Sequence, residues 1–527
     1  MKVAIIDFYT DEPSGLGVPP YLGTYPRYVF GALTLNPNID EIFYLSVDDI
    51  RDLSCSSKLD QLRTDIKRYN LTRKREEVYE ILRKSDLLIF IMGLLTPGKY
   101  LRAVPGTFNE LMKLNDSLEK FHKGIIAKKI KLLFGPIAFG FGSSGIGGIY
   151  IKNDFYERIN SFFNRIVNTE DYEFFQHLPD SFNQTKFNLS SFDYINKISL
   201  LGVKIVEQIP WEVIVELETY RGCTKAFPCS FCVEKLKNTV SFRDVNGIVE
   251  EGKSFSNVGV KHFRLGKQTS FYYYFNAQIN KIEFLLRSLR ELNPITLHID
   301  NVNPLHVVSE KGNIITKLIV KYCTPGNVAA LGIESVDPKV IELNNLKVDS
   351  QTALKAIEII NKFGSERGYN GMPMFLPGIN LLFGLIGETK SSFQYAFDFL
   401  MEILNRNLMV RRVNIREVVP FKGTLLEQKV GNKYIRKNRK YYFSWRKKIR
   451  EEFDNVMLQR ILPKGTILKD CLAEIHDGNH TFLRQFGSYP LVVGVNDRLE
   501  LGKKYDIKVT SYMLRSVIGE VVKTKEN

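Results

Sequence analysis

The chain has few cysteines and tryptophans and no long apolar run. Its 527 residues include six cysteines and two tryptophans, and three of the cysteines stand between positions 223 and 232. Such a sparse and uneven set excludes a small disulfide-stapled scaffold. No stretch approaches the roughly 20 apolar residues of a membrane span, and the N-terminal sequence MKVAIID lacks the basic flank and cleavage site of a signal peptide. We therefore expect a cytoplasmic protein without a membrane span.

The overall composition is that of a globular protein. Hydrophobic residues make up 44% of the chain and charged residues 25%, which excludes an intrinsically disordered protein. The length allows roughly two to four domains. The formal net charge is +15. In many proteins such an excess of positive charge mainly keeps the surface hydrated, but it also favours polyanionic partners such as RNA.

Residues 1–200 alternate short apolar runs with longer polar or amphipathic stretches. The apolar runs are 3–7, 42–45, 86–93 and 130–136. Strands that alternate with helices in this way predict a parallel sheet with helices on both faces, a Rossmann-like or flavodoxin-like α/β layer. Loops rich in Gly and Pro lie at the strand ends, where open α/β sheets bind ligands. These loops are 13–23, 93–99 and 139–148.

The three clustered cysteines form the motif Cys223-x5-Cys229-x2-Cys232. Thiolates are soft ligands that suit iron–sulfur clusters and zinc, and a Cys-x-x-Cys turn offers two sulfurs to one centre. A structural zinc site needs four protein ligands, yet the sequence has no second Cys-x-x-Cys and no close His pair. Three sulfurs leave one position open for a substrate or cofactor. The alternatives are a partial zinc knuckle and a redox Cys-x-x-Cys.

The alternation of strands and helices continues through residues 205–426. Six strands are predicted there, at 213–218, 262–266, 296–300, 328–334, 379–384 and 413–418. Helical patterns lie between them, such as 276–292 and 350–363, the second with Asp349 as its cap. Six βα units make a partial TIM barrel, whose chemistry lies at the carboxyl ends of the strands.

Residues 205–426 resemble the radical S-adenosylmethionine (SAM) superfamily. Its signature is Cys-x3-Cys-x2-Cys with an aromatic residue before the last cysteine, here Phe231. The first spacer has five residues instead of three, which we interpret as the mark of a subgroup. The resemblance implies that Cys223, Cys229 and Cys232 hold a [4Fe-4S] cluster whose open iron binds SAM.

The strand ends resemble superfamily elements in the same order. Gln268 stands where the usual Gly-Gly-Glu segment has its glutamate, so we expect only the backbone there to accept the SAM amino group. Glu334 resembles the carboxylate that accepts hydrogen bonds from the ribose hydroxyls. The residues that the resemblance places at the cofactor are Phe231, Gly266, Lys267, Gln268, Asp300, Glu334, Ser335, Gly384 and Glu388.

The resemblance implies reductive cleavage of SAM to a 5′-deoxyadenosyl radical, which takes a hydrogen atom from an unactivated carbon. Such an enzyme needs a low-potential electron donor. The barrel orients the substrate and excludes water. The sequence singles out no catalytic hydrogen-atom donor. The aromatic run 272–274 is either a substrate wall or ordinary packing.

Residues 1–200 resemble the cobalamin-binding-like domain that precedes the barrel in many radical SAM proteins. The Asp-x-His-x-x-Gly motif, which supplies a histidine to cobalt in some of these domains, is missing. The resemblance therefore leaves two interpretations open: a layer that binds cobalamin, and a fold retained for packing or substrate contact. Cys55 is the one cysteine of this segment, which argues against the second three-cysteine cluster of methylthiotransferases.

The end of the chain is predicted to face RNA. Residues 427–462 form a basic helical linker in which aromatic residues alternate with Lys433, Arg436, Lys437, Arg439, Lys440, Arg446, Lys447 and Lys448. Basic side chains neutralise phosphates and rings stack on exposed bases; the alternative is an ordinary solvated helix face. Residues 463–527 show five short strands, which predict a small OB-like barrel and resemble a TRAM domain of tRNA-modifying enzymes.

Two enzyme functions follow from these observations. One is a radical SAM enzyme that modifies a base in tRNA or other RNA. The other is a cobalamin-dependent radical SAM methyltransferase that acts on a protein, lipid or small molecule. A non-enzymatic RNA-binding scaffold with a structural cluster is a third class. The sequence identifies neither the modified atom nor the reaction that follows hydrogen abstraction.

Overall fold

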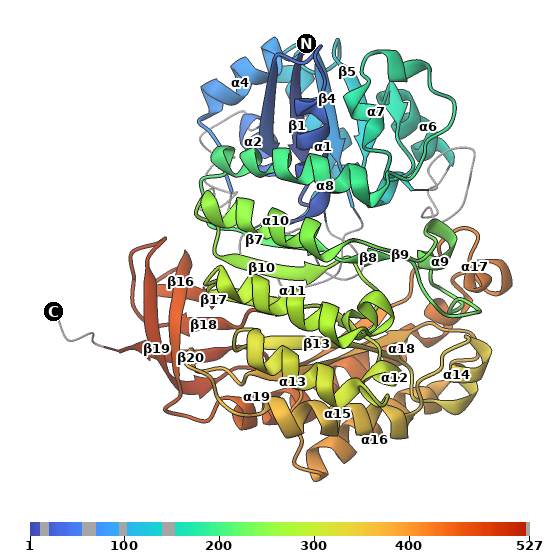
Figure 1. The fold of residues 1–527 in the computed structure, drawn as a ribbon, viewed down its shortest axis with the longest axis vertical. Helices are drawn as coiled ribbons and strands as arrows, with labels where there is room; N and C mark the ends of the chain where they lie inside the picture. The colour runs from blue at the N-terminus through green and yellow to red at the C-terminus, as the bar shows by residue number, and fades with distance from the viewer. Residues whose placement is uncertain (11–19, 55–69, 94–102, 140–152, 523–527) are drawn as a thin grey trace. The chain divides into compact units, whose positions relative to one another are not determined.

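The computed structural model describes residues 1–10, 20–54, 70–93, 103–139 and 153–522 (Figure 1). Contacts divide the chain into two compact units. Unit 1 comprises Met1–Glu216 and Lys253–Val260, and unit 2 comprises Leu217–Gly252 and Lys261–Asn527. The boundary passes through strand β7 (Ile214–Glu218) and helix α10 (Val245–Asn257). The predicted domain limits near residues 200, 426 and 462 stay predictions.

Unit 1 is built on a five-stranded parallel sheet in the order β3-β1-β4-β5-β6. Its strands are β1 (Lys2–Asp7), β3 (Glu41–Ser46), β4 (Leu87–Ile91), β5 (Ile130–Phe134) and β6 (Arg165–Ile166). The first four coincide with the apolar runs of the sequence. Because helices cover both faces of a doubly wound sheet, its strands read as continuous apolar runs, and the predicted α/β class is confirmed.

Helices pack on both faces of this sheet. One face buries an apolar cluster with residues from α2, α4, α5 and α6, and α1 packs against the other. The helices are α1 (Thr24–Thr34), α2 (Val47–Ser54), α4 (Arg75–Lys84), α5 (Phe108–Phe121), α6 (Asn153–Phe162), α7 (Glu173–Gln176) and α8 (Phe192–Leu201), with 3-10 turns at η2 (Pro136–Ala138), η3 (Asp180–Asn183) and η4 (Gly202–Gln208). Strand β2 (Tyr21–Leu22) pairs with the first residues of β7.

Helices α1 and α8 touch backbone to backbone. A Cβ atom at Gly31 would lie 2.0 Å from Ile198 O, and one at Gly202 would lie 2.3 Å from Arg27 O. Any larger residue at either position would force the two segments apart, since real Cβ contacts are never that short.

Unit 2 begins with parallel βα units. The six predicted strands are all present, together with a short β12, as β7, β10 (His262–Gly266), β11 (Thr296–Ile299), β12 (Asn301–Val302), β13 (Asn327–Glu334), β14 (Phe375–Phe383) and β15 (Arg412–Glu417). Strand β10 pairs with β11, and β12, β13, β14 and β15 pair in sequence order, all in parallel. The parallel strands of unit 2 therefore form two sheets, and the chain passes from one to the other at Asp300, between β11 and β12.

Helices follow the strands of unit 2 along the chain. They are α9 (Glu234–Lys237), α10, η5 (Phe271–Asn276), α11 (Ile279–Glu291), α12 (Pro304–Val307), α13 (Gly312–Tyr322), α14 (Pro338–Leu343), α15 (Ser350–Gly364) and α16 (Lys390–Asn405). The predicted cap of α15 is present, because the Asp349 side chain accepts a hydrogen bond from Thr352 N. Strands β8 (Tyr220–Arg221) and β9 (Ser241–Phe242) pair antiparallel across a long loop, residues 222–240.

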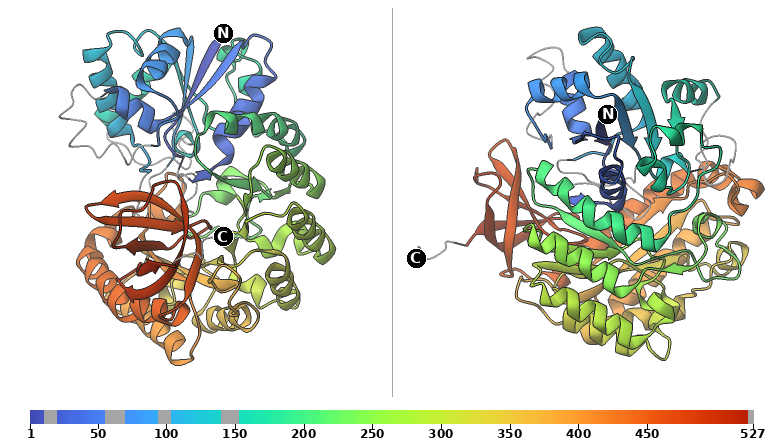
Figure 2. Two further views of the ribbon diagram at one scale, coloured as in Figure 1. Left: turned by 90° about the vertical axis from the view of Figure 1, so that its left-hand side faces the viewer. Right: turned by 45° about the horizontal axis from the view of Figure 1, so that its top comes forward.

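The chain ends in three helices and a small barrel, orange and red in Figure 2. The helices are α17 (Leu425–Lys429), α18 (Lys433–Ile449) and α19 (Asn455–Ile461), with a π-helical turn, η6 (Arg450–Asp454), before the last. The barrel is closed in the order β16-β17-β18-β20-β19. Its strands are β16 (Ile467–Asp477), β17 (His480–Gln485), β18 (Val492–Val495), β19 (Lys504–Tyr512) and β20 (Val517–Val521). Among the described residues, no helix is long and apolar enough to cross a membrane.

Candidate functional site

The three cysteines lie in the loop of unit 2 between β8 and β9, and each is partly buried. The Cys-x-x-Cys segment forms a turn in which Cys232 N donates to Cys229 O at 3.0 Å. Helix α9 follows the turn directly. The antiparallel pairing of β8 with β9 closes the excursion, so the two ends of the cysteine loop are fixed.

The thiols are close enough to affect one another's charge. Burial raises the pKa of Cys232 to about 12, and the charges of Cys229 and Cys223 add to the rise. In the described ranges, no three His, Cys, Asp or Glu side chains form a group that could hold one metal ion.

Two lysines shape the five-residue spacer between the first two cysteines. Lys225 donates from Nζ to Cys229 Sγ at 3.0 Å. Lys235, on α9, donates to the carbonyl oxygens of Lys225 and, at 2.5 Å, of Ala226. Burial raises the pKa of the Cys229 thiol, and the charge and hydrogen bond of Lys225 act against that rise. No sequence motif marks either lysine as part of the site.

Asn344, directly after α14, ties the cysteine loop to the turn that follows β14. Its Oδ1 accepts from Ser230 Oγ at 2.6 Å and from Ile386 N at 3.1 Å, and its Nδ2 donates to Ile386 O at 2.9 Å. Its backbone oxygen accepts from Ser230 N at 3.0 Å. The side chain is fully buried. One amide thus fixes the two loops that carry Cys229 and Glu388.

The end of β10 is held by side chains that the resemblance placed at the cofactor. Gln268 accepts from Thr219 Oγ1 at 3.1 Å and donates to Leu265 O at 3.0 Å. Gly266 O accepts from Thr219 N at 3.2 Å. Lys267 Nζ lies 3.7 Å from Glu218 Oε1. These contacts join the ends of β7 and β10 in unit 2.

Glu334 ends β13 in an unusual backbone conformation. Its φ is +67°, and the pairing of β13 with β14 shifts register between Gly332 and Glu334. Such irregularities re-aim a side chain at the edge of a sheet. Burial raises the pKa of Glu334 to about 7, although the charges of Arg416 and Lys225 oppose the rise. Glu334 thus lies near enough to the cysteine loop for the charge of Lys225 to affect it, and its contact with the SAM ribose stays a prediction.

Ser335 and Phe231, which the resemblance also placed at the cofactor, differ in their contacts. Ser335 is buried and accepts from Asp337 N at 3.3 Å, at the start of α14. Phe231 packs against the apolar cluster that contains Leu385 and Ile386. Both residues thus support the loops around the cysteines.

Glu388 closes its own turn and fixes helix α18. Its Oε2 accepts from Gly384 N at 2.8 Å, and its Oε1 accepts from Asn438 Nδ2 at 2.9 Å. Burial raises the pKa of Glu388 to about 7, while the hydrogen bonds from Gly384 and Asn438 oppose that rise. Asn438 lies in the middle of the basic run, where no sequence motif marks it as part of the site.

Asp300 lies in a buried ion pair. Its carboxylate contacts the guanidinium of Arg264 and accepts from Tyr489 OH at 2.9 Å. Tyr489 belongs to the segment between β17 and β18 of the C-terminal barrel and packs with Val328 and Ala330 of β13. The C-terminal barrel thus inserts a side chain against the parallel strands of unit 2, a contact that the sequence did not suggest.

The aromatic run after β10 packs inside unit 2. Tyr272 and Tyr274 are fully buried. Tyr272 OH lies 2.8 Å from Thr316 Oγ1, and Tyr274 OH donates to Arg243 O at 2.7 Å. Of the two interpretations of this run, the structure favours packing for these two residues.

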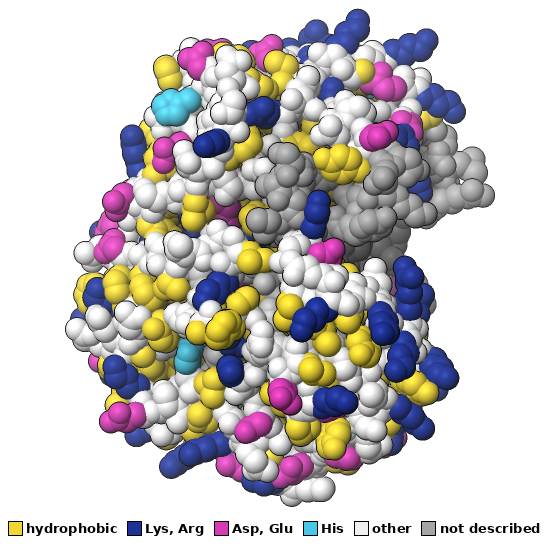
Figure 3. Space-filling view, turned by 90° about the vertical axis from the view of Figure 1, so that its right-hand side faces the viewer, with side chains coloured by type: hydrophobic (Ala, Val, Ile, Leu, Met, Phe, Trp, Pro, Cys, Tyr) yellow, Lys and Arg dark blue, Asp and Glu magenta, His cyan; other side chains and the backbone are white. Residues whose placement is uncertain are grey.

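Helix α18 presents its basic residues outward. The exposed ones are Lys433, Arg436, Lys437, Arg439, Lys440, Arg446 and Lys447. Lys448 is half-buried, with Nζ 4.0 Å from the centre of the Phe397 ring. The opposite face of the helix buries Asn438, Tyr442 and Ile449. Figure 3 shows Lys and Arg side chains in a row along the right-hand edge of its lower half.

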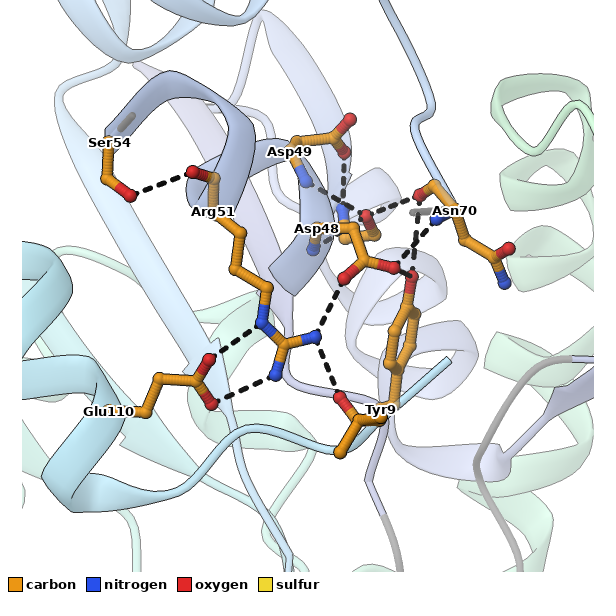
Figure 4. Close-up of polar contacts among 9 residues, drawn as sticks. Tyr9, Asp48, Asp49, Arg51, Ser54, Asn70 and Glu110 are labelled. Carbon is orange, nitrogen blue, oxygen red and sulfur yellow. Dashed lines mark hydrogen bonds and ion pairs between the residues drawn. The ribbon is translucent and has the colours of Figure 1, made fainter. Parts of the chain in front are cut away.

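Polar side chains at the carboxyl edge of the sheet in unit 1 form a hydrogen-bonded network (Figure 4). Arg51 Nη1 lies 2.7 Å from Asp48 Oδ1, and its Nε lies 2.7 Å from Glu110 Oε1. Asp48 Oδ2 accepts from Tyr9 OH at 2.8 Å and from Asn70 N at 2.7 Å. These groups hold α2 to α5 and to the end of β1. Most of the three predicted Gly- and Pro-rich loops, and Cys55, lie outside the described residues.

The chain is similar in sequence to a known superfamily and to two archaeal proteins. The model of the radical SAM superfamily matches residues 217–400. The uncharacterized protein MJ0274 of Methanocaldococcus jannaschii is 40% identical over 546 residues, which cover 99% of this chain and 93% of that protein. An uncharacterized protein of Archaeoglobus fulgidus is 36% identical over 531 residues, which cover 98% of this chain and 89% of that protein.

Among solved structures, the chain is similar to TsrM, a radical SAM methyltransferase from Kitasatospora setae with cobalamin and a [4Fe-4S] cluster bound. The TM-score is 0.46 and the identity 11%, with coverage of 81% of this chain and 77% of that chain. The resemblance to the radical SAM superfamily is confirmed by the match to residues 217–400, which contains the three cysteines. The chain belongs to the same family as MJ0274 and is a radical SAM enzyme, which uses a [4Fe-4S] cluster and SAM.

Proposed function

We propose that this radical SAM enzyme modifies a base in RNA, most simply in tRNA. The observation that carries the proposal is the build of α18. Seven of its basic side chains are exposed, while its inner face is fixed to Glu388, at the end of the turn after β14. A phosphate backbone bound to this helix would therefore be held at a fixed place relative to the strand ends of unit 2.

Aromatic side chains accompany the cations of α18. Phe443 is 47% exposed, and the Arg446 guanidinium lies 5.9 Å from the centre of its ring. Exposed rings and guanidinium planes stack on unpaired bases whatever their sequence. A helix of this kind suits a single-stranded loop better than a regular duplex.

The C-terminal barrel supports the same proposal. Five strands closed in the order β16-β17-β18-β20-β19 have the connectivity expected of a small OB-like barrel. Exposed lysines stand on its surface at Lys464, Lys469, Lys503, Lys504 and Lys508. We infer that this barrel is a TRAM-like RNA-binding module and that it acts together with α18.

The residues of the site have distinct proposed roles. Cys223, Cys229 and Cys232 would hold the cluster, and Glu334 would accept hydrogen bonds from the ribose hydroxyls of SAM. When bound, the cluster and SAM supply the radical that starts the reaction. Such chemistry requires that water be excluded from the site.

Several other residues that the resemblance placed at the cofactor act through their neighbours in this proposal. Gln268 and Lys267 hold the end of β10, and Glu388 with Gly384 holds the turn after β14. Asp300 keeps Arg264 and Tyr489 in place. We propose that these groups shape the SAM pocket, and that direct contact with SAM comes from the nearby backbone.

RNA binding by α18 can be tested by salt dependence. The triple variant R436Q/K437Q/K440Q removes three exposed cations from α18, and K317Q/K355Q/K362Q removes three from α13 and α15. Binding of bulk tRNA is measured between 50 and 200 mM salt. The α18 variant should bind more weakly, with a slope of log K against log salt that is smaller by about 0.7–0.9 for each phosphate that the helix no longer neutralises. The control variant on α13 and α15 should keep the wild-type slope.

Salt-insensitive binding by the wild type, or equal slopes in both variants, would contradict the proposal.

A second candidate is a cobalamin-dependent radical SAM methyltransferase that acts on a protein, lipid or small molecule. The order β3-β1-β4-β5-β6 in unit 1 favours it, because a doubly wound sheet of this order has a ligand crevice at its switch point, here between β1 and β4. Reconstitution with cobalamin, followed by desalting and an absorbance spectrum, tests this candidate. A spectrum without corrin bands after desalting would rule it out.

A further inference from the structure

The longer spacer between the first two cysteines carries an ammonium group to the cluster site. Lys225 follows Cys223 by two positions, and its Nζ donates to Cys229 Sγ at 3.0 Å. A spacer of five residues has room for this side chain to fold back on the next cysteine. The departure from the usual three-residue spacing therefore has a structural consequence.

The position of Lys225 is built into the loop. Lys235, on α9, donates to the carbonyl oxygens of Lys225 and Ala226. Glu234 Oε1 accepts from Gly222 N at 2.9 Å, and Asn345 Nδ2 donates to Pro228 O at 3.2 Å. The spacer is thus anchored at its start, its middle and its end, so the ammonium does not depend on Cys229 alone for its place.

We propose that Lys225 raises the reduction potential of the cluster through its positive charge and its hydrogen bond to Cys229 Sγ. Potentials of iron–sulfur clusters depend on net charge, on hydrogen bonds to sulfur and on solvent exposure. Reduction adds one electron, taken from a low-potential donor, and Lys225 keeps its proton before and after. The added negative charge is stabilised by a cation in contact with one of the ligand sulfurs.

Reduction adds negative charge to the cluster, so the site without the Lys225 ammonium would be harder to reduce. The inference depends on the family's cluster and does not depend on RNA as the substrate.

The test is a redox titration of the anaerobically reconstituted holoenzyme, followed by electron paramagnetic resonance of the reduced cluster. Lys225→Met should lower the reduced-to-oxidised ratio at a given potential by about tenfold or more, a shift of about 59 mV per tenfold for one electron. Lys225→Arg keeps the charge and should stay near the wild-type potential. Lys225→Gln keeps an N–H donor without charge and should fall between them.

Lys339→Met is the matched control, because Lys339 is an exposed lysine at the start of α14 in the same unit. It removes the same charge and should leave the potential unchanged. Iron and sulfide contents are compared first. If Lys225→Met fails to hold a cluster, Lys225→Gln takes its place in the comparison. A wild-type potential in the uncharged variants, or an equal shift in Lys339→Met, would overturn the proposal, whether or not the enzyme binds RNA.

Discussion

Single side chains hold the cysteine loop in place. Asn344 joins Ser230 to Ile386, and Lys235 pins the spacer that carries Lys225. The sequence suggested the three cysteines because they share a motif with characteristic spacing, and it suggested Glu334 because of its place at the end of a predicted strand. It could not predict Asn344, which lies 114 positions from Ser230 and has no neighbour that marks its role. Long-range contacts of this kind depend on how the strands assemble.

Replacing Asn344 with alanine should loosen the cluster loop. The change leaves Ser230 Oγ and the Ile386 backbone without buried partners, which costs about 1–3 kcal/mol of unfolding free energy for each buried group left unsatisfied. We expect lower iron and sulfide content per chain after reconstitution. Both contents and the thermal midpoint are measured.

Asn361→Ala provides the matched control for this prediction. Asn361 also donates to the carbonyl oxygen four residues back and bridges to a distant backbone, that of Met409. It should lower the thermal midpoint to a similar degree and leave the cluster content intact. Equal cluster loss in both variants would show that Asn344 acts only on general stability.

Glu334→Gln should weaken the binding of SAM. A neutral amide cannot replace the charge-assisted hydrogen bonds that we assign to this carboxylate, which are worth about 1.5–3 kcal/mol, or roughly tenfold or more in Kd. Equilibrium dialysis with SAM on the cluster-loaded enzyme measures the effect, with cluster content unchanged. An unaltered Kd would remove Glu334 from the site.

Secondary-structure elements were predicted best where burial is continuous. Strands β1, β4 and β13 coincide with apolar runs, and burial of both faces of the sheet makes a strand the expected structure for such runs. Short elements such as β2, β6 and β12 escaped prediction because two-residue strands depend on their partners alone. The buried face of α18 was not predicted either, because nothing in the sequence distinguishes Asn438 from the other polar residues of the basic run.

The Asp7 carboxyl at the end of β1 should make the unfolding free energy of unit 1 depend on pH. Burial raises the pKa of Asp7 from 3.8 to about 6, despite hydrogen bonds from Tyr44 and Thr10. The protonated form is thus favoured in the folded state. Its stabilising contribution is complete below pH 3.8 and is lost as the pH rises through about 6, a change of roughly 3 kcal/mol.

Hydrogen exchange of the β1 amides between about pH 4 and pH 7.5, corrected for intrinsic rates, follows this change. Asp7→Asn should flatten the profile in part, because the pKa of Asp49 is also raised to about 6 by burial and that carboxyl remains. An Asn side chain can still accept a hydrogen bond from Tyr44 OH through its Oδ1, so the fold should tolerate it. Identical profiles for the two proteins would contradict the assignment.

Tyr489 should fasten the C-terminal barrel to the parallel strands of unit 2. Tyr489→Phe removes the hydrogen bond to the Asp300 carboxylate and should cost about 1.5–3 kcal/mol of unfolding free energy. Tyr505→Phe, on β19 of the same barrel, removes an exposed contact with Glu500 N and should cost well under half of that. Urea denaturation compares the two; equal losses would show that the insertion adds little.

At the scale of the whole molecule, the basic helix α18 and the candidate active site lie in the same unit. The cysteine loop, Glu334, the basic helix α18 and the closed barrel all belong to unit 2. Their order along the chain was predictable, since each segment has its own composition and spacing. What the sequence could not supply is the connection between them: Glu388 to Asn438, and Asp300 to Tyr489. Those two contacts join the predicted reaction site to the predicted RNA-binding surface.

The most direct measurement is mass spectrometry of nucleosides from the tRNA and rRNA of a strain that lacks the gene. The account predicts that at least one modified nucleoside disappears, returns with the wild-type gene and does not return with Cys232→Ala. An RNA nucleoside profile that is identical with and without the gene would contradict RNA as the substrate.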